Sequence, residues 1–418
     1  MMRLKLKVLH ISVHLGGGAG KAISGLINGL VDYDNALLLL EKPVDTKYYD
    51  ACIDAGINIT VSDDIQVIRH LVEDNDLIIL NWWCHPLFVK VFQALDGIDK
   101  KIIIWSHING LHYPYMPFEF IGVFDGCMFT SSCTFDNDYW SDKEKEKIRQ
   151  KSAIVYGIGD FKPEMCPHKS DYKIRGSFKI GYTGTLSFNK ASREFPIICE
   201  EIKNIIPDAS FEMYGKADNE FKKLFDSDYV HFNGYTDNLD DILPQMDVFC
   251  YPLNAENFAT TENALLEAMA AGLPVVVLDN PTMRSIITHG KNGLIAMNTD
   301  QFARYMKELY LDADLRRMLG ENARKSVIDR YDGENNCEVC EKYIECVMRT
   351  ASHQHDFAAK GLTTPRGFFK YFCYKDYEQV EKYLNGDRSI ILPDIYLGKG
   401  KSSFSQFNTY FHIFEGVK

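Results

Sequence analysis

Three loops in this sequence have residue types that could bind an anion. The first is Leu15–Ala22 (LGGGAGKA), between an apolar run and a helical pattern. A glycine loop in that place exposes backbone N–H groups at a helix N-terminus, where the helix dipole favours negative charge. It is not a P-loop, because Leu15 stands in place of the first glycine and Ala22 in place of the Ser or Thr hydroxyl. It is not a dinucleotide fingerprint either, because Lys21 stands in place of the last glycine. We expect a local site for an anion or a close ligand; a tight turn alone is the alternative.

The second loop, GYTGTLSFNK at 181–190, also leaves a strand-like run. Lys190 lies six residues beyond Gly184, so its ammonium can return to the mouth of the loop as a point charge for phosphate. A solvated surface lysine is the alternative.

The third loop leads into a helix, in ENFATTENALLEAMAAGLP at 256–274. Thr260 or Thr261 can cap this helix, whose free N–H groups would face the same mouth. Glu262 stands at the helix start and Glu267 among apolar residues of its interior. A carboxylate in that setting needs a fixed partner, such as a ribose diol. A capping acid followed by a solvated glutamate is the alternative.

His107 ends the apolar run IIIWSH, at the strand edge where open αβ sheets bind ligands, although a structural histidine remains the alternative. No His/Cys set has zinc-ligand spacing, so we expect no metal site. The 11 cysteines are scattered, mostly in apolar runs, which favours reduced, buried thiols in a cytoplasmic protein.

The composition of the chain limits the classes of molecule that it is expected to bind. The chain has 46 basic and 58 acidic residues, a net charge of −12, which disfavours nucleic acid and anionic lipid as general partners. No apolar run approaches the roughly 18 residues of a transmembrane helix. His10 and His14 interrupt the N-terminal apolar run and glycines follow it, so we expect a strand there and no signal peptide.

Strand-like runs alternate with helical patterns over most of the chain, which predicts an α/β fold with parallel sheets. Among the predicted strands are 6–13, 77–81, 101–105 and 178–183, and the last one along the chain is 273–278. The segment 161–177 has mixed charge, prolines and no periodicity, so we expect a linker there. The predicted parts are an N-terminal αβ domain (1–165), a second αβ domain (178–335), a C-terminal helix (336–350) and an extension (351–418).

The extension differs in composition. Its 68 residues hold 9 Lys or Arg, 7 Asp or Glu, and 14 Phe or Tyr, without clear αβ alternation. This composition permits packing on the N-terminal domain, oligomerisation or peripheral contact with a membrane, and the alternatives stay open.

Five motifs together resemble a retaining GT-B glycosyltransferase of family 4 (group 1) type, over roughly residues 6–350. They are HLGGGAGKA, GYTGTLSFNK, FEMYGK, HFNGYTDNLDDILPQMDVFCYPL and TTENALLEAMAAGLPVVV. The resemblance implies two Rossmann-like domains facing each other across a cleft, with a sugar nucleotide held mainly by the second. The N-terminal Rossmann-like domain (1–165) would then be on the acceptor side, the C-terminal Rossmann-like domain (178–335) would bind the nucleotide sugar, and the helix 336–350 would cross back towards the N-terminal domain. It implies no metal ion and no cofactor.

The resemblance also implies roles by position. Lys190 corresponds to the diphosphate-binding lysine, Glu267 to the glutamate that holds the ribose hydroxyls, and His107 to the histidine beside the transferred sugar. The remaining donor-site positions are Gly17, Gly18, Thr185, Tyr214, Gly215, Thr260, Thr261, Asn263 and Ala264. Two positions depart from the family pattern: Thr185 stands where arginine is common, and Ala259 where glutamate is common, with Glu262 as a candidate catalytic replacement.

The expected function is transfer of a hexose from a nucleoside-diphosphate sugar to a hydroxyl acceptor, a glycan or lipid-linked glycan, with retention, as in polysaccharide biosynthesis. The expected location is the cytoplasm, including the inner face of the membrane. Two alternatives remain: a sugar-nucleotide epimerase of the same fold, which would act without an acceptor, and a non-catalytic protein that binds nucleotide sugar.

Overall fold

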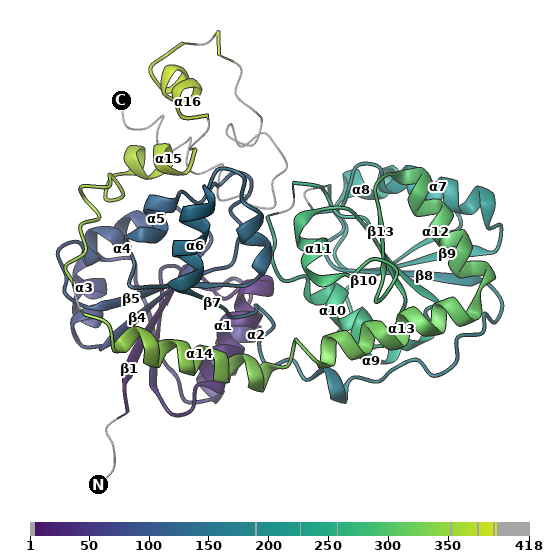
Figure 1. Ribbon diagram of the computed structural model, residues 1–418, viewed down its shortest axis with the longest axis horizontal. Coiled ribbons are helices and arrows are strands. Elements are labelled where there is room, and N and C mark those ends of the chain that lie inside the picture. Colours follow the sequence, from purple (N-terminus) through teal and green to yellow (C-terminus); the bar gives the residue numbers. More distant parts are fainter. Residues whose placement is uncertain are drawn as a thin grey trace. The chain divides into compact units, whose positions relative to one another are not determined.

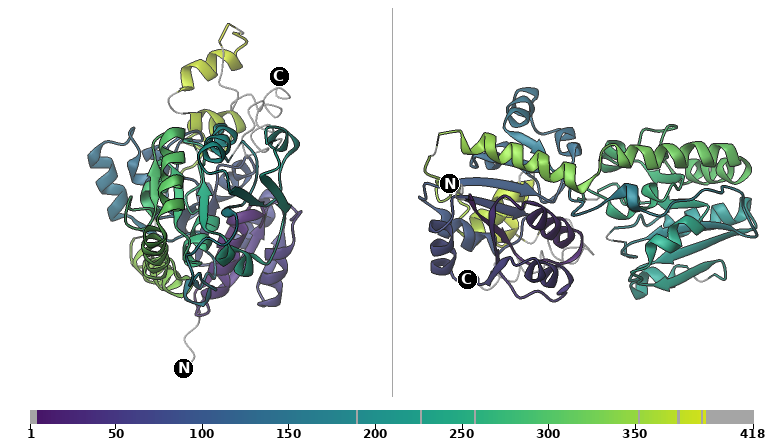
Figure 2. Two further views of the ribbon diagram at one scale, coloured as in Figure 1. Left: turned by 90° about the vertical axis from the view of Figure 1, so that its right-hand side faces the viewer. Right: turned by 90° about the horizontal axis from the view of Figure 1, so that it is seen from below.

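The structure is a computed structural model that describes residues 5–188, 190–225, 227–256, 258–351, 353–373, 376–387 and 389–390. The chain forms two compact units (Figure 1, Figure 2). The first unit comprises residues 1–160, 258–261 and 333 onward, and the second comprises residues 161–257 and 262–332.

The first unit is built on a seven-stranded parallel sheet with the order β3-β2-β1-β4-β5-β6-β7. Its central strands are continuous apolar runs buried on both faces, as expected where helices cover a parallel sheet. The strands are β1 (Lys7–Ser12), β2 (Asp34–Leu39), β3 (Asn58–Val61), β4 (Leu77–Trp82), β5 (Lys101–Ser106), β6 (Gly126–Phe129) and β7 (Ser152–Ile154).

The helices of the first unit come from both ends of the chain. Within the unit, α1 packs against α2 and α14, and α3 packs against α4 (Figure 1). The helices are α1 (Gly17–Gly29), α2 (Lys47–Asp54), α3 (Ile65–Glu73), α4 (Phe88–Leu95), α5 (Phe118–Gly122), α6 (Asp142–Gln150), α14 (Gly333–Met348), α15 (Pro365–Cys373) and α16 (Tyr377–Leu384), with a 3-10 turn at Ser132–Asp136.

The second unit has a six-stranded parallel sheet with the order β10-β9-β8-β11-β12-β13. Its strands are β8 (Phe178–Thr183), β9 (Ala209–Tyr214), β10 (Val230–Gly234), β11 (Val248–Tyr251), β12 (Val275–Leu278) and β13 (Leu294–Ala296). Its helices are α7 (Phe195–Ile205), α8 (Asn219–Lys223), α9 (Leu239–Ile242), α10 (Asn263–Ala270), α11 (Pro281–Ile286), α12 (Thr299–Leu311) and α13 (Ala313–Ile328), with 3-10 turns at Pro163–Met165 and Leu243–Gln245.

The predicted α/β class with two Rossmann-like domains is confirmed. The predicted linker at 161–177 begins at the boundary of the two units and holds only a 3-10 turn, and it packs within the second unit. The Tyr172 hydroxyl donates to the Gly272 carbonyl at 2.8 Å, and the buried Arg316 guanidinium donates to the Tyr172 carbonyl. Prolines and mixed charge concealed this anchoring from the sequence pattern.

The described part of the extension packs on the first unit. Phe357, Phe368 and Phe372 are buried. The Phe357 ring stacks on Phe92 with centroids 4.8 Å apart, and the Phe372 ring lies 5.1 Å from Trp82. These aromatic side chains of the extension, whose number made membrane contact one of the open alternatives, therefore pack into the core of the first unit. No helix in the described ranges is long and apolar enough to span a membrane.

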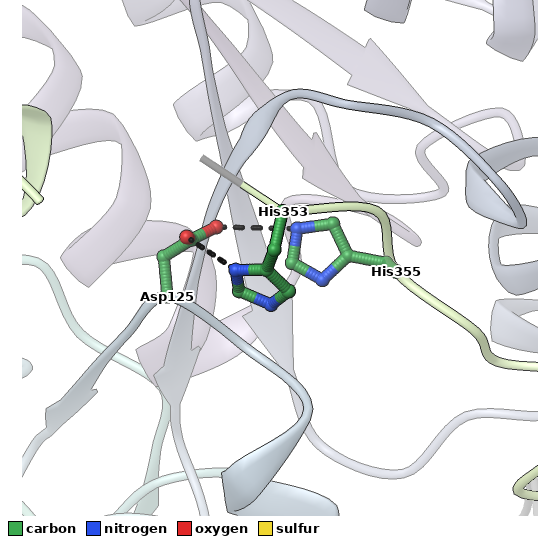
Figure 3. Close-up of side chains that lie close together, drawn as sticks. All are labelled: Asp125, His353 and His355. Atoms are coloured by element: carbon green, nitrogen blue, oxygen red, sulfur yellow. Dashed lines mark ion pairs between the residues drawn. The ribbon is translucent and has the colours of Figure 1, made fainter. Parts of the chain in front are cut away.

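A buried charge network also fixes the extension (Figure 3). The rings of His353 and His355 both point at the Asp125 carboxylate, at 3.4 Å and 3.2 Å. The ammonium of Lys101 lies 3.1 Å from the same carboxylate, and His355 is fully buried. Its Nδ1 lies 2.9 Å from the Val123 carbonyl oxygen. Both ring nitrogens of His355 thus face oxygen acceptors, which requires a doubly protonated imidazolium.

This cluster is the group of described residues that most resembles a metal site. The two oxygens of the Asp125 carboxylate, however, already accept hydrogen bonds. One Asp125 oxygen accepts from Lys101, and the other accepts from the Ile102 amide at 2.8 Å and faces His355. An ammonium 3.1 Å from a carboxylate oxygen disfavours a second cation there. Asp125, His353 and His355 therefore fit a hydrogen-bonded network of protonated side chains better than a site for a divalent cation.

The network predicts a pH dependence of stability in the first unit. Burial alone would lower the pKa of His355, but hydrogen bonds to Asp125 and to the Val123 carbonyl raise it above 6.5. Its stabilisation is therefore complete below pH 6.5 and is lost as the pH rises through the folded-state value. We expect the free energy of unfolding to fall between pH 6.5 and 9 more steeply in the wild type than in His355→Gln.

Tryptophan fluorescence measures this difference, since all four tryptophans (Trp82, Trp83, Trp105 and Trp140) belong to the first unit. His353→Gln is the matched control, because that ring is half exposed and should contribute little. Equal slopes for His355→Gln and the wild type would contradict the buried imidazolium.

The Asp125 carboxylate gives a second pH dependence, in acid. Burial would raise its pKa, but its hydrogen bonds lower the pKa to about 2. The ionised carboxylate therefore contributes about 2 kcal/mol to the free energy of unfolding, and this contribution is lost only below pH 3.8.

Candidate functional site

Two glycine turns meet at the carboxyl edge of the second sheet. Gly184 follows β8 with φ +123°, and Gly215 follows β9 with φ +138°. A Cβ on Gly215 would lie 1.9 Å from the Gly184 carbonyl oxygen, so only glycine fits there. The Gly184 amide donates to the Tyr214 carbonyl at 2.9 Å, which holds the two turns together. The backbone is thereby open to a ligand at this edge.

A pocket of about 260 Å³ opens beside these turns. Five predicted donor-site residues line it, coming from β8, β9 and α10: Thr185, Tyr214, Gly215, Ala264 and Glu267. Parallel strands bring these positions together because their carboxyl ends share one edge, where such sheets bind ligands. Asn263 begins α10 next to this lining.

Lys190 returns to the mouth of the glycine loop, as its spacing predicted. Its Nζ lies 3.5 Å from where a Cβ on Gly184 would stand. The same ammonium lies 3.0 Å from the Glu262 carboxylate and 5.3 Å from the centre of the Tyr251 ring. Glu262 is only 2% exposed, and it accepts a 2.8 Å hydrogen bond from the Tyr251 hydroxyl. The lysine proposed for a diphosphate is therefore held in a defined place.

The predicted capping of α10 by threonine is wrong. The N-cap residue is Glu262, and it forms no side-chain cap. Thr260 and Thr261 belong to the first unit, where the Thr260 hydroxyl bonds to the Thr130 hydroxyl. The Thr261 hydroxyl donates to the Thr130 carbonyl at 2.7 Å and accepts from the Gly157 amide. The two threonine hydroxyls thus bond to residues that are distant in the sequence, and a local sequence pattern does not reveal such partners.

In the first unit, Gly17 and Gly18 lie exposed at the start of α1. The first turn of α1 carries no acidic residue, so no side chain of that turn offsets the positive end of the helix dipole. The Gly16 amide donates to His14 Nδ1 at 3.0 Å, which fixes the bend before the helix. The predicted glycine loop thus exists, with its backbone open to solvent.

His107 follows β5 at the carboxyl edge of the first sheet. Its Nε2 lies 3.4 Å from the Asn81 side-chain oxygen, and the Asn81 amide nitrogen donates to the Ile11 carbonyl. Burial lowers the pKa of His107 to about 3, so the ring is neutral at physiological pH. A neutral imidazole can exchange hydrogen bonds with a sugar hydroxyl, but it supplies no charge to a phosphate.

Several site residues escaped the sequence reading. Tyr235, Thr236 and Leu239 also line the pocket of the second unit, together with Thr183, Gly184 and Lys216 of the motifs GYTGTLSFNK and FEMYGK. Tyr235 and Thr236 follow β10, two strands away from β8, and lie in the motif HFNGYTDNLDDIL, which supported the family resemblance without being assigned a role. Tyr251, the last residue of β11, is likewise absent from the predicted site residues.

Comparisons with known proteins agree with this geometry. Residues 177–312 match the family described as "Glycosyl transferases group 1". The matched segment is about a third of the chain. The match covers most of the second unit, including the pocket, Lys190 and Glu262.

The chain is also similar to two curated proteins from Bacillus. EpsD of Bacillus subtilis (strain 168), assigned as a glycosyltransferase, is 25% identical over 235 residues, 52% of this chain and 60% of its own. N-acetyl-alpha-D-glucosaminyl L-malate synthase of Bacillus anthracis is 29% identical over 220 residues, 49% of this chain and 56% of its own. The matched part thus spans less than two thirds of either relative.

The fold has close counterparts among solved structures. Anabaena HepE in complex with UDP-glucose superposes with a TM-score of 0.64 at 15% identity, covering 81% of this chain and all of that one. At this identity the likeness concerns the fold, which is the GT-B architecture of two Rossmann-like domains.

Proposed function

We propose that the chain transfers a hexose from a nucleoside-diphosphate sugar to a hydroxyl acceptor, with retention of anomeric configuration and without a metal ion. The observation that carries the proposal is the pocket of the second unit, which is lined by two glycine turns, Ala264 and Glu267, with the Lys190 ammonium beside the Gly184 turn. Exposed backbone and one ammonium suit a diphosphate, and the Glu267 carboxylate suits a ribose diol.

In this mechanism the main task is to stabilise negative charge on the leaving diphosphate. Preorganised donors aimed at that charge are usually the largest single contribution, and Lys190 with the turn amides provides them. Glu262 is bound to Lys190 and Tyr251, which makes it a poor nucleophile. We therefore favour a same-face reaction in which a leaving phosphate oxygen takes the acceptor proton. His107, neutral, would bond to a sugar hydroxyl.

The nucleotide and the acceptor are finer parts of the proposal. UDP is our first candidate, since HepE was solved with UDP and with UDP-glucose. Tyr214 and Tyr235 in the pocket lining offer aromatic surface near the place of a base. The acceptor in this proposal is a glycan, free or lipid-linked, in the cytoplasm or at the inner face of the membrane.

Binding and product analysis test the proposal. Thermal unfolding is followed with UDP, GDP and their sugars, and a ligand at 100 times its Kd should add about 2.7 kcal/mol. With the stabilising donor and a mixed glycan acceptor, EDTA should leave the rate unchanged and NMR should show the donor's anomeric configuration in the product. Stabilisation by no nucleotide would contradict the proposal. Conversion of the donor sugar without acceptor would favour an epimerase instead.

A further inference from the structure

The lysine of the diphosphate site is already ion-paired. Lys190 is 25% exposed, whereas its partner Glu262 is almost completely buried. The Tyr251 hydroxyl donates to the same carboxylate oxygen that faces Lys190, and its ring lies beneath the ammonium. Since a buried carboxylate is costly without charged and hydrogen-bonding partners, these three side chains form one interdependent unit.

The pairing changes the charge that a diphosphate would meet. Lys190 and Glu262 together are neutral, and Thr185 contributes no charge beside them. Among the described residues that line the pocket, the cation is Lys216, which is exposed and follows the Gly215 turn. A diphosphate that uses Lys190 must therefore compete with a buried carboxylate or share the ammonium with it. Three N–H donors allow such sharing.

We propose that Glu262 is an internal counter-ion that holds Lys190 in position for the diphosphate, and that Tyr251 is the positioning residue for Glu262. The inference rests on the proposed function of this pocket. It gives Glu262 a positioning role, in place of contact with the donor sugar. Because Glu262 competes with the diphosphate for the Lys190 ammonium, the donor binds more weakly in the ground state. The attraction between Lys190 and the diphosphate then grows as negative charge develops on the leaving group. Stronger binding in the transition state than in the ground state raises the rate.

Nucleotide affinities of matched variants test this role. In Glu262→Gln the amide oxygen still accepts from Tyr251 but the negative charge is gone. We expect UDP or GDP, whichever the wild type binds, to bind on the order of 10-fold tighter by calorimetry, as expected when a like charge beside a phosphate is removed. We expect kcat to fall, because Lys190 is no longer held.

Tyr251→Phe should act in the opposite direction on affinity. Without the hydroxyl, the carboxylate depends more on Lys190, so the same nucleoside diphosphate should bind about threefold more weakly, the scale of one hydrogen bond. A merely structural role for the two residues predicts the same sign for both variants.

Glu267→Gln is the matched control, being the same change five residues further along, on the pocket lining. It should weaken binding, since a ribose contact is lost. The gain in Glu262→Gln should vanish with UMP or GMP, which lack the second phosphate. Equal or weaker diphosphate binding by Glu262→Gln, with wild-type binding intact, would overturn the counter-ion. Failure of the wild type to bind UDP and GDP would contradict the proposed function itself.

Discussion

Replacing Lys190 by alanine should lower turnover by on the order of 10²-fold or more at saturating donor, the scale of removing one donor aimed at a developing charge. The reason is geometric: the ammonium borders the Gly184 turn, and Thr185 provides no second charge there. Initial rates of sugar transfer across donor concentrations separate kcat from KM. Because the charge grows in the transition state, we expect the loss mainly in kcat.

Two controls separate this loss from damage to the fold. Lys223→Ala removes an exposed lysine of α8 and should leave the rate unchanged. Lys190→Ala leaves Glu262 buried without its cation, which should lower the melting temperature, so the double variant with Glu262→Gln should regain stability without regaining activity. An unchanged rate in Lys190→Ala would refute the assignment of this lysine to the diphosphate.

The second large effect concerns the extension. Phe372→Ala should destabilise the first unit by about 3–5 kcal/mol, the usual cost of emptying a buried phenylalanine site. The ring lies within 5.1 Å of the Trp82 ring centre and 4.9 Å of that of Phe120. Denaturant unfolding followed by tryptophan fluorescence reports this unit, and Trp82 is in direct contact with the altered position.

Val44→Ala is the control for this variant, since Val44 is fully exposed in the same unit and should change stability by less than about 0.5 kcal/mol. A loss below about 1 kcal/mol in Phe372→Ala would mean that the extension is not part of the core. Activity should survive at temperatures where the variant remains folded, because Phe372 lies outside both candidate sites.

The sheets were predictable because their strands are short, continuous apolar runs. β8 was placed at its observed bounds, and β1, β4 and β5 to within a residue at either end. β13 was missed, since a run of three residues carries no period. The packing of the extension was left open for a different reason: Phe357, Phe368 and Phe372 gain their burial from residues more than 200 positions away.

The candidate site was predictable where geometry follows from local chain chemistry. Glycines after a strand predicted the turn at Gly184, and side-chain length predicted the return of Lys190. The Lys190–Glu262 pair was not foreseen, because it joins two loops 72 residues apart. The partners of Thr260 and Thr261 escaped for the same reason, since Thr130 lies about 130 residues earlier in the chain.

The order in which the first unit receives its parts has a consequence for synthesis on the ribosome. Domains generally fold as they emerge, N-terminal domain first. Here residues 5–160 emerge first but lack α14 and α15, whose residues lie beyond position 332. At about 5–20 residues per second, the 213 residues between Asp160 and Cys373 take roughly 10–40 s to appear. The second unit is complete at residue 332, so the unit that starts first is finished last, with Trp82 and Phe92 awaiting their aromatic partners in the meantime.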